Sequence, residues 1–562
     1  MTTLARWFSR LVPAFVAGLV LLSFEPVAAR NGAPVTFGSN KRASVQSPAG
    51  WNEPSGIVGS DGVLNLAFQN PNATLTSAVS RSADGVHWAG NSAYTAHDAT
   101  KPEGDLGDVT MAADQAGTIF VGHLTQTLQA DIDYSRDGGA TWQTAAGVTP
   151  VLGSSTSPFL VDRPWIAVQS PDTDFHHTTV YLSFHDFGPS LVYVVSCPMA
   201  SGSLRCGPPV PVSNLQTSCN SIPGGIAVSP PKSAHPGRVY AAWSTADPLT
   251  NTLTGCNITQ LAPFYAVFAA YSDTPTDPAS WHQAPVFIGP TQDPKCPSTT
   301  SVGTSGGSPL PPTSTCADVS EIFTPIAIDN AGNAYVAFVD FIDTLDPHYD
   351  VYVAHSTDGG ATWDGRADGS GLPTRVSNAG GTHFLPNLVA GDAGRVAVGY
   401  YATPYADRPF EAGDSCPATV PPEFSCQGKA MAEPPSTAWV YDVAESTNAA
   451  SSAPGYTQVQ ASDPSVVPHY GDICNLGIYC DGSSTGNRSV FDSTSVFTDA
   501  NGFVQAAWSD QRSDPNAQTD AASSTAQSDQ VKFDEVEAAC QTGGASLLAS
   551  PPGPPVCSGH KK

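Results

Sequence analysis

Charged residues are scarce in this chain, and basic residues are the scarcest. Only 13% of its 562 residues are charged, and 23 lysines and arginines stand against 50 aspartates and glutamates. The formal net charge is −27 and the sequence pI is about 4.5. No basic stretch offsets this balance, so we expect neither nucleic acid nor an anionic membrane surface as a partner.

Several signatures of chemistry are also missing. The sequence has no HExxH segment, no phosphate-binding glycine loop and no haem attachment motif. These absences argue against zinc proteases, nucleotide-dependent enzymes and cytochromes. Helical periodicity is nearly absent, whereas glycine (51) and proline (50) are abundant. This composition favours an all-β chain of many strands joined by turns.

The one long hydrophobic run lies at the N-terminus. Arg6 and Arg10 precede an apolar stretch over 11–24, and the small residues of 27–29 follow it. This pattern predicts a signal peptide over 1–29, cleaved after Ala29. The protein is then secreted, or lies on the periplasmic or cell-wall side. An uncleaved membrane anchor is the alternative.

The cysteines are even in number, at 12, and none is in CxxC spacing. In an exported chain this predicts disulfides rather than zinc thiolates. Local pairing is a hypothesis, because sequence does not fix connectivity. The expected pairs are Cys197–Cys206, Cys219–Cys256, Cys296–Cys316, Cys416–Cys426, Cys474–Cys480 and Cys540–Cys557.

A repeat runs through the chain. A short apolar strand turns at Asp/Asn-x-Gly or a similar segment and returns on a second apolar strand. A third strand follows most of these hairpins, and a less distinct fourth comes after it. The hairpins cover 53–68, 107–124, 163–186, 224–244, 324–340, 386–401 and 493–510.

Four antiparallel strands repeated around an axis make a β-propeller. We therefore predict a single propeller over about 45–540, with seven four-stranded blades. Six blades plus an extra strand pair is the alternative, since ring closure can split one blade between the termini. Residues 30–44 are expected as an N-terminal lead-in and 541–562 as a Pro/Gly-rich tail.

Two octapeptides repeat almost letter for letter, SRDGGATW at 135–142 and STDGGATW at 356–363. They resemble the Asp-box, or BNR repeat, of sialidase-superfamily propellers. Their matching positions are Ser135, Asp137, Gly139, Thr141 and Trp142, and Ser356, Asp358, Gly360, Thr362 and Trp363. We expect each box between a third and a fourth strand, where Asp accepts backbone N–H bonds and Gly permits a positive φ. Their role is then to stabilise the fold, not to carry chemistry.

In such a propeller, the residues just before each first strand ring the mouth of the central channel. Carboxylates gather there with Tyr, His and Arg, a set suited to glycoside chemistry. The candidate catalytic residues are Asp108, Asp162, Glu321, His383 and Tyr470. The candidate substrate-binding residues are Glu53, Arg163, Asp472, Arg488 and Asp492.

The resemblance implies a glycoside hydrolase that acts on extracellular glycans or polysaccharide. The early segment WNEPSGIVG (51–59) lacks the arginine motif that sialidases carry there. A non-catalytic propeller that binds glycan, protein or cell wall is the alternative. No cofactor is expected, although the same carboxylates suit calcium. We expect a monomer with a glycan ligand and no membrane insertion.

Overall fold

The computed structural model describes most of the chain between residues 33 and 560. The gaps are 47–48, 71–76, 102–103, 148–159, 187–190, 215–216, 218–221, 246–265, 289–322, 341–348, 366–372, 379, 406–435, 472, 474–489, 491, 515 and 518–533. The predicted signal peptide therefore lies outside the described residues. No helix within the described part is long and apolar enough to cross a membrane.

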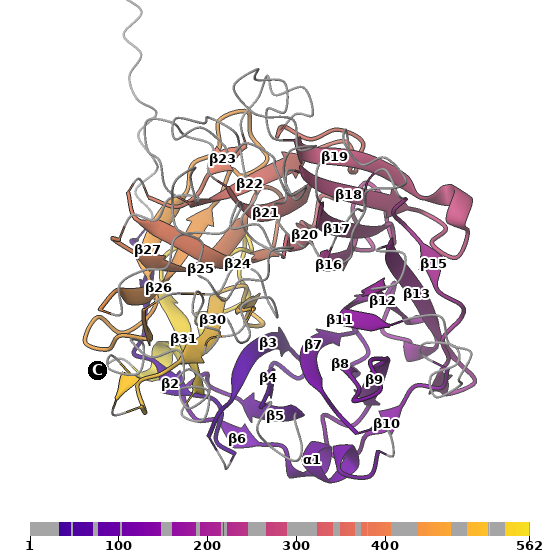
Figure 1. Cartoon of the computed structure of the whole chain (residues 1–562), viewed down its shortest axis with the longest axis horizontal. Helices are drawn as coiled ribbons and strands as arrows, with labels where there is room; N and C mark the ends of the chain where they lie inside the picture. The colour runs from indigo at the N-terminus through magenta and orange to yellow at the C-terminus, as the bar shows by residue number, and fades with distance from the viewer. Residues whose placement is uncertain are drawn as a thin grey trace, which may run out of the picture.

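The described residues form a seven-bladed β-propeller, as predicted, with sheets arranged radially around one axis (Figure 1). The first three blades are β3 (Asn52–Val58) to β6 (Ala89–Gly90), β7 (Gly107–Ala113) to β10 (Gln143–Thr144), and β11 (Val161–Gln169) to β15 (Val210–Pro211). Their middle strands are β4 (Leu64–Gln69), β5 (Ser77–Ser82), β8 (Ile119–Leu124), β9 (Ala130–Ser135), β12 (Thr179–Asp186) and β13 (Leu191–Ala200), and β14 (Ser203–Leu204) is a further edge strand of the third blade.

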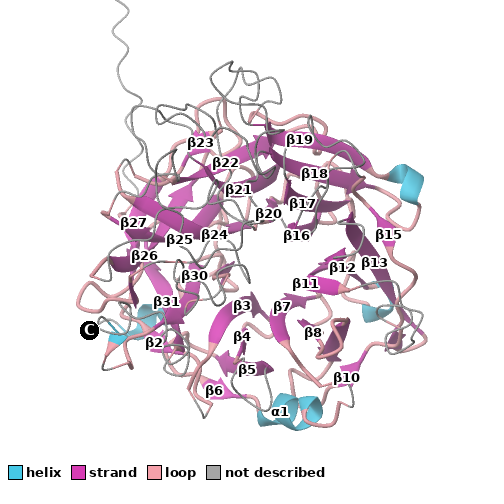
Figure 2. Cartoon of the chain, viewed as in Figure 1, coloured by secondary structure: helices cyan, strands magenta, loops and turns pink. Residues whose placement is uncertain are grey.

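The next three blades are β16 (Ile222–Val228) to β19 (His282–Ile288), β20 (Ile326–Ile328) to β23 (Thr374–Arg375), and β24 (Thr382–Ala390) to β28 (His469–Tyr470). Their middle strands are β17 (Val239–Thr245), β18 (Ala266–Ser272), β21 (Ala334–Asp340), β22 (Asp350–Ser356), β25 (Val396–Thr403) and β26 (Ala438–Ser446), and β27 (Thr457–Gln460) is a further edge strand of the sixth blade. Strands dominate the fold, and its main helix is the short α1 (Ser92–Asp98) between the first two blades (Figure 2).

Both ends of the chain build the seventh blade. Its inner strands are β29 (Ser495–Thr498), β30 (Val504–Asp510) and β31 (Glu535–Gly543), and its outer strands are β1 (Thr36–Phe37) and β2 (Lys41–Arg42). Residues expected as a lead-in thus pair with β31. The innermost strands contact one another in the cyclic order β3, β7, β11, β16, β20, β24, β29 and back to β3. The blades therefore pack side by side into a closed ring around the axis.

In five blades of the described part, the first strand is bulged near its N-terminal end. The register shifts between 52 and 55, 107 and 110, 162 and 165, 223 and 225, and 384 and 387. Four bulges hold a non-glycine residue at positive φ, namely Glu53 (48°), Asp108 (49°), Arg163 (51°) and Leu385 (57°). Bulges re-aim side chains, and strained backbone of this kind clusters at functional sites.

The two octapeptides form matching turns between third and fourth strands. In the second blade, Gly139 N donates to Ser135 Oγ at 2.7 Å, and Thr141 N and Oγ1 donate to the Asp137 carboxylate at 2.8 and 2.6 Å. In the fifth blade, the corresponding bonds of Gly360 and Thr362 are 2.9, 2.9 and 2.6 Å. Gly139 has φ 85° and Gly360 φ 91°. Residue types and spacing therefore fix these turns locally.

The core lies between neighbouring sheets rather than in one central mass. Trp142 packs its ring edge-to-face against Tyr94 of α1 at 4.9 Å, and Trp363 joins residues of the fourth and fifth blades. Two predicted disulfides are present among the described residues. Cys197–Cys206 joins β13 to the segment after β14, and Cys540–Cys557 joins β31 to the tail. The other four predicted pairs each include cysteines outside the described residues.

Candidate functional site

Five residues predicted for the channel mouth come together through hydrogen bonds, ion pairs and charge. We call Glu53, Asp108, Asp162, Arg163 and Asp492 the mouth cluster. Arg163 Nη1 lies 2.8 Å from Glu53 Oε2 and 3.3 Å from Asp108 Oδ1. The backbone N–H of Asp492 donates to Glu53 Oε1 at 2.9 Å. The first, second, third and seventh blades therefore all contribute to one site.

Gln69 also belongs to this site, although the sequence analysis did not select it. It is the last residue of β4, and its Nε2 donates to Glu53 Oε2. Its Oε1 accepts from the backbone N–H of Asp108 at 2.5 Å. One amide thus fixes a carboxylate of the first blade relative to the strained backbone of the second. The sequence signal for Gln69 was its position as the last residue of a second strand, at the same end of the blade as the start of the first strand.

The mouth cluster holds four carboxyl groups around one guanidinium. Burial raises the pKa of Asp162 to about 7, Asp108 and Asp492 add to the rise, and Arg163 opposes it. Burial acts against the charge of Arg163, but Glu53 and Asp108 raise its pKa. Asp162 is therefore the group that takes up a proton near neutral pH, because further negative charge is unfavourable here.

Arg163 has unused donors. Its Nε and Nη2 donate to no group among the described residues, although only 4% of the residue is exposed. Its guanidinium carbon lies 5.0 Å from the centre of the Trp165 ring and 4.6 Å from that of Phe323. These two rings meet edge-to-face at 5.6 Å. A buried guanidinium with free N–H groups can bind a hydroxyl or an anionic group.

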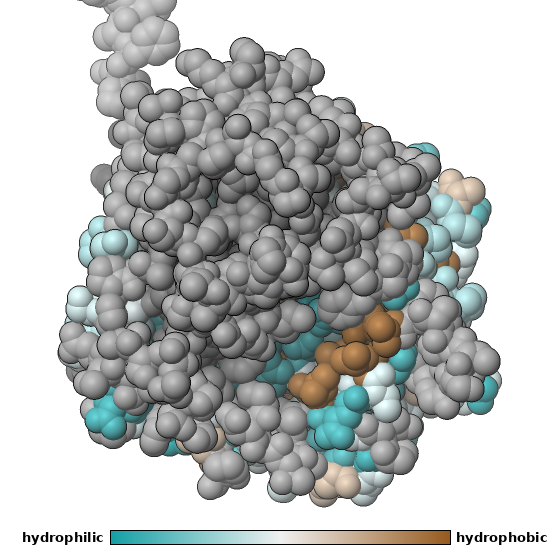
Figure 3. All heavy atoms as spheres, viewed as in Figure 1, coloured by the Kyte–Doolittle hydropathy of each residue, from teal (hydrophilic) through white to brown (hydrophobic). Residues whose placement is uncertain are grey.

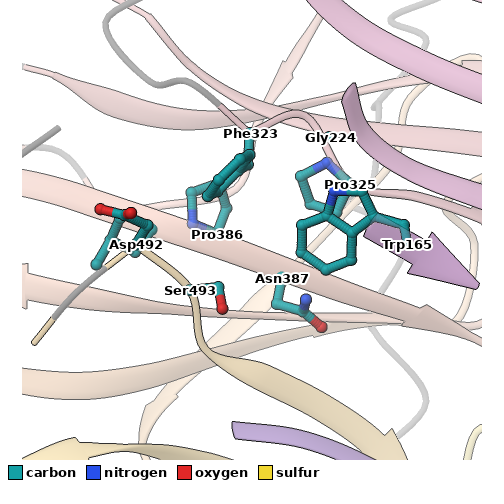
Figure 4. A pocket seen from close by; sticks show the side chains of 9 residues that line it. Trp165, Gly224, Phe323, Pro325, Pro386, Asn387, Asp492 and Ser493 are labelled. Carbon is teal, nitrogen blue, oxygen red and sulfur yellow. The ribbon is translucent and has the colours of Figure 1, made fainter. Parts of the chain in front are cut away.

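An apolar pocket adjoins these charges. Figure 4 shows Trp165 and Pro325 on one side and Asp492 on the other, with Phe323 and Pro386 between them; Gly224 also lines the pocket. Leu385 and Pro325 also line it. Gly224 is needed for the close approach of two blades, because a Cβ there would lie 1.9 Å from Thr324 N. The pocket therefore places apolar side chains directly beside Asp492 and Asn387.

The surface beside the mouth is partly hydrophobic. Figure 3 shows a brown patch bordered by hydrophilic residues on the face seen in the view. Leu106 and Leu160 directly precede β7 and β11, and their exposed fractions are 41% and 49%. Both therefore offer apolar contact area next to Asp108 and Asp162.

The remaining candidates are not brought to the mouth cluster by any contact of the described residues. His383 is buried, with Nδ1 3.1 Å from Asp350 Oδ1 and 3.3 Å from Tyr349 O. It lies two residues before Leu385, the residue that occupies the bulge in its blade. Tyr470 lies in β28 and pairs with Ala438 of β26, in the outer part of the sixth blade. Glu321, Asp472 and Arg488 lie outside the described residues.

A second group of ionisable residues, which the sequence analysis did not select, lies between α1 and the second blade. Asp98, His123 and Asp133 are buried, and each offers one ligand atom within 4.8 Å of the others. Among the described residues, this is the group of His, Cys, Asp and Glu with the spacing of a metal site. Calcium binding at the mouth stays a prediction.

Comparison with known proteins finds fold-level similarity only. No family model matches the chain, and no curated protein matches it. Solved structures with 14% identity and a TM-score of 0.37 include a Dyadobacter fermentans protein of unknown function, which aligns over 66% of this chain and 94% of its own. An α-L-arabinofuranosidase from Fusarium graminearum aligns over 65% and 92%, and an α-L-arabinanase from Penicillium chrysogenum over 65% and 94%, at the same identity and TM-score. Similarity at this level assigns neither a function nor site residues to this chain.

Proposed function

We propose that this protein is a glycoside hydrolase whose active site is the mouth cluster. The observation that carries the proposal is that two carboxyl groups of one small site have different surroundings. The pKa of Asp162 is raised to about 7, while Asp108 lies 3.3 Å from the positive charge of Arg163. Glycosidases need such a pair, one carboxyl that donates a proton and one that attacks or activates water.

Each member of the cluster then has a role. Asp162 protonates the glycosidic oxygen as the general acid. The side chain of Asp108 is 20% exposed, so it can reach the substrate as the base or nucleophile. Arg163 donates to substrate through Nε and Nη2, Glu53 and Gln69 hold the guanidinium and the Asp108 backbone in place, and Trp165 and Phe323 wall the sugar ring.

The wider setting is part of the proposal. An N-terminal signal peptide would export the chain, and its substrates would be extracellular glycans or polysaccharide. The octapeptide turns resemble Asp-boxes and support membership of the sialidase superfamily as a structural class. The missing early arginine motif argues that the substrate differs from that of the sialidases. Calcium remains a candidate ligand because carboxylate oxygens suit it.

The test is a panel of polysaccharides and chromogenic glycosides, including sialosides, incubated with the purified protein with and without calcium. Release of reducing sugar from one member is expected. Asp108→Asn should lower kcat by at least about 100-fold, while Asp172→Asn, on an exposed turn of the third blade, should not. If the protein retains a glycan but turns over no member of the panel, the hydrolase proposal is wrong and the protein is a glycan-binding propeller.

A further inference from the structure

The buried group between α1 and the second blade is arranged around a cation. Asp98 ends α1, Lys101 follows it, and His123 and Asp133 come from β8 and β9. The side chains of Asp98, His123 and Asp133 have no exposed surface, and that of Lys101 is 5% exposed. Four ionisable groups without solvent need close mutual compensation.

Their polar atoms converge on one point. Lys101 Nζ lies 2.5 Å from His123 Nε2, 2.5 Å from Asp133 Oδ2 and 3.4 Å from Asp98 Oδ1. One imidazole nitrogen and two carboxylate oxygens at such spacing are a ligand set for a divalent transition metal. The ammonium stands where that ion would stand.

Further polar side chains orient the ligands, as is usual in metal sites. His123 Nδ1 lies 3.3 Å from Asp105 Oδ1, which leaves Nε2 to face the centre of the group. Asp133 Oδ1 accepts from Thr144 Oγ1 at 2.7 Å and lies 3.1 Å from His97 Nε2. A carboxylate behind a ligating imidazole, and a hydrogen-bonded ligating carboxylate, are the usual outer partners of a metal site.

The carboxylate of Asp98 is an independent observation that points to a site for a divalent cation. Neither of its carboxylate oxygens accepts a hydrogen bond from the described residues, although only 3% of the residue is exposed. Its nearest compensating charge is the ammonium at 3.4 Å. Lys101 Nζ therefore donates to Asp133 and contacts His123 Nε2, whereas it compensates Asp98 only by charge.

We propose that Asp98, His123 and Asp133 form a divalent-cation site of the Zn²⁺ or Co²⁺ type, and that Lys101 occupies it. The ammonium acts as an internal cation that fastens the connection between α1 and β7 to the second blade. Exogenous metal is excluded because Lys101 Nζ fills the position between the ligands. The inference does not depend on the glycoside hydrolase proposal.

The test is to remove the Lys101 ammonium from its position between the three ligands in the full chain. In metal-free buffer, Lys101→Ala should unfold at a lower temperature than the wild type, because its carboxylates lose their cation. Zn²⁺ should restore the midpoint, and Co²⁺ should bind with one-to-one stoichiometry and visible absorption bands of low-coordinate cobalt. We expect at least a 100-fold tighter Co²⁺ dissociation constant than in the wild type, which should show neither effect.

The matched control is Lys101→Ala combined with His123→Ala, which vacates the position but removes the nitrogen ligand. Equal Co²⁺ affinity in the single and double variants would overturn the proposal. So would one-to-one, His123-dependent metal binding by the wild type, since Lys101 would then not exclude metal. If Lys101→Ala does not fold without metal, refolding that requires both Zn²⁺ and His123 supports the proposal, and failure to refold with Zn²⁺ counts against it.

Discussion

At the scale of single residues, the site depends on the bulges near the start of the first strands, because a bulge changes the direction of a side chain. Glu53 and Arg163 each precede a proline and occupy the positive-φ position of a bulge. Leu385, before Pro386, holds the same position in the sixth blade. Aligning the blades on these X-Pro steps would have selected Leu385 instead of His383. Gln69 could not be found in this way, because its role depends on contacts between two blades.

The raised pKa of Asp162 predicts the pH dependence of catalysis. A general acid must be protonated, and this carboxyl loses its proton as the pH rises through about 7. The rate, kcat/KM, should therefore fall about tenfold per pH unit above that value. A pH–rate profile that stays flat to pH 9 would remove Asp162 from the role of acid.

A second buried acid predicts the pH dependence of stability. Burial raises the pKa of Glu445 in β26 from its ordinary value of 4.5 to about 8. The folded state then binds a proton that the unfolded chain releases, so the free energy of unfolding falls as the pH rises from about 4.5 to 8. The contribution is about 1.4 kcal/mol per pH unit. Glu445→Gln should remove it, as denaturant unfolding at pH 5 and pH 8 would show, whereas Asp174→Asn on an exposed turn should leave the slope unchanged.

At the scale of elements, the hairpins and turns could be read from the sequence because their determinants are local. All seven hairpins fall on the first and second strands of blades, and the octapeptide turns depend on bonds within eight residues. The buried group of Asp98, Lys101, His123 and Asp133 could not be predicted from the sequence. Its members come from α1, the segment after it, β8 and β9, and they meet only when α1 packs against the second blade.

The octapeptide turns should matter for stability and not for activity. Asp137 accepts three hydrogen bonds, from Ser135 Oγ and from Thr141 N and Oγ1. Asp137→Ala should lower the free energy of unfolding by about 1–2 kcal/mol, as the loss of a capping carboxylate does. Thr141→Ser keeps both of its bonds to Asp137 and serves as the control. Loss of glycan binding or turnover in Asp137→Ala without loss of stability would contradict a purely structural turn.

At the scale of the whole molecule, the ring depends on a joint between the two ends of the chain. β1 and β2 pair with β31, and Arg42 Nη1 lies 2.6 Å from Glu535 Oε1. The predicted seven blades were correct because their hairpins repeat in sequence. The part played by residues 36–42 was not predicted, since these strands are two residues long and their partners lie some 500 positions away.

Removing this joint should weaken the propeller as a unit. A chain that begins at residue 45 lacks β1 and β2, so β31 loses its outer partners. We expect a lower thermal midpoint in calorimetry than for a chain that begins at residue 33. Equal midpoints for the two chains would show that the seventh blade is stable without strands from the N-terminus.

The central claim is that the mouth cluster cleaves a glycan, and one measurement tests it most directly. Reducing-end release by the wild type, Asp162→Asn and Asp172→Asn should be compared on the same glycan panel at neutral pH. The account predicts release by the wild type and Asp172→Asn, and a loss of at least about 100-fold in Asp162→Asn at unchanged thermal midpoint. Undiminished release by Asp162→Asn would contradict it.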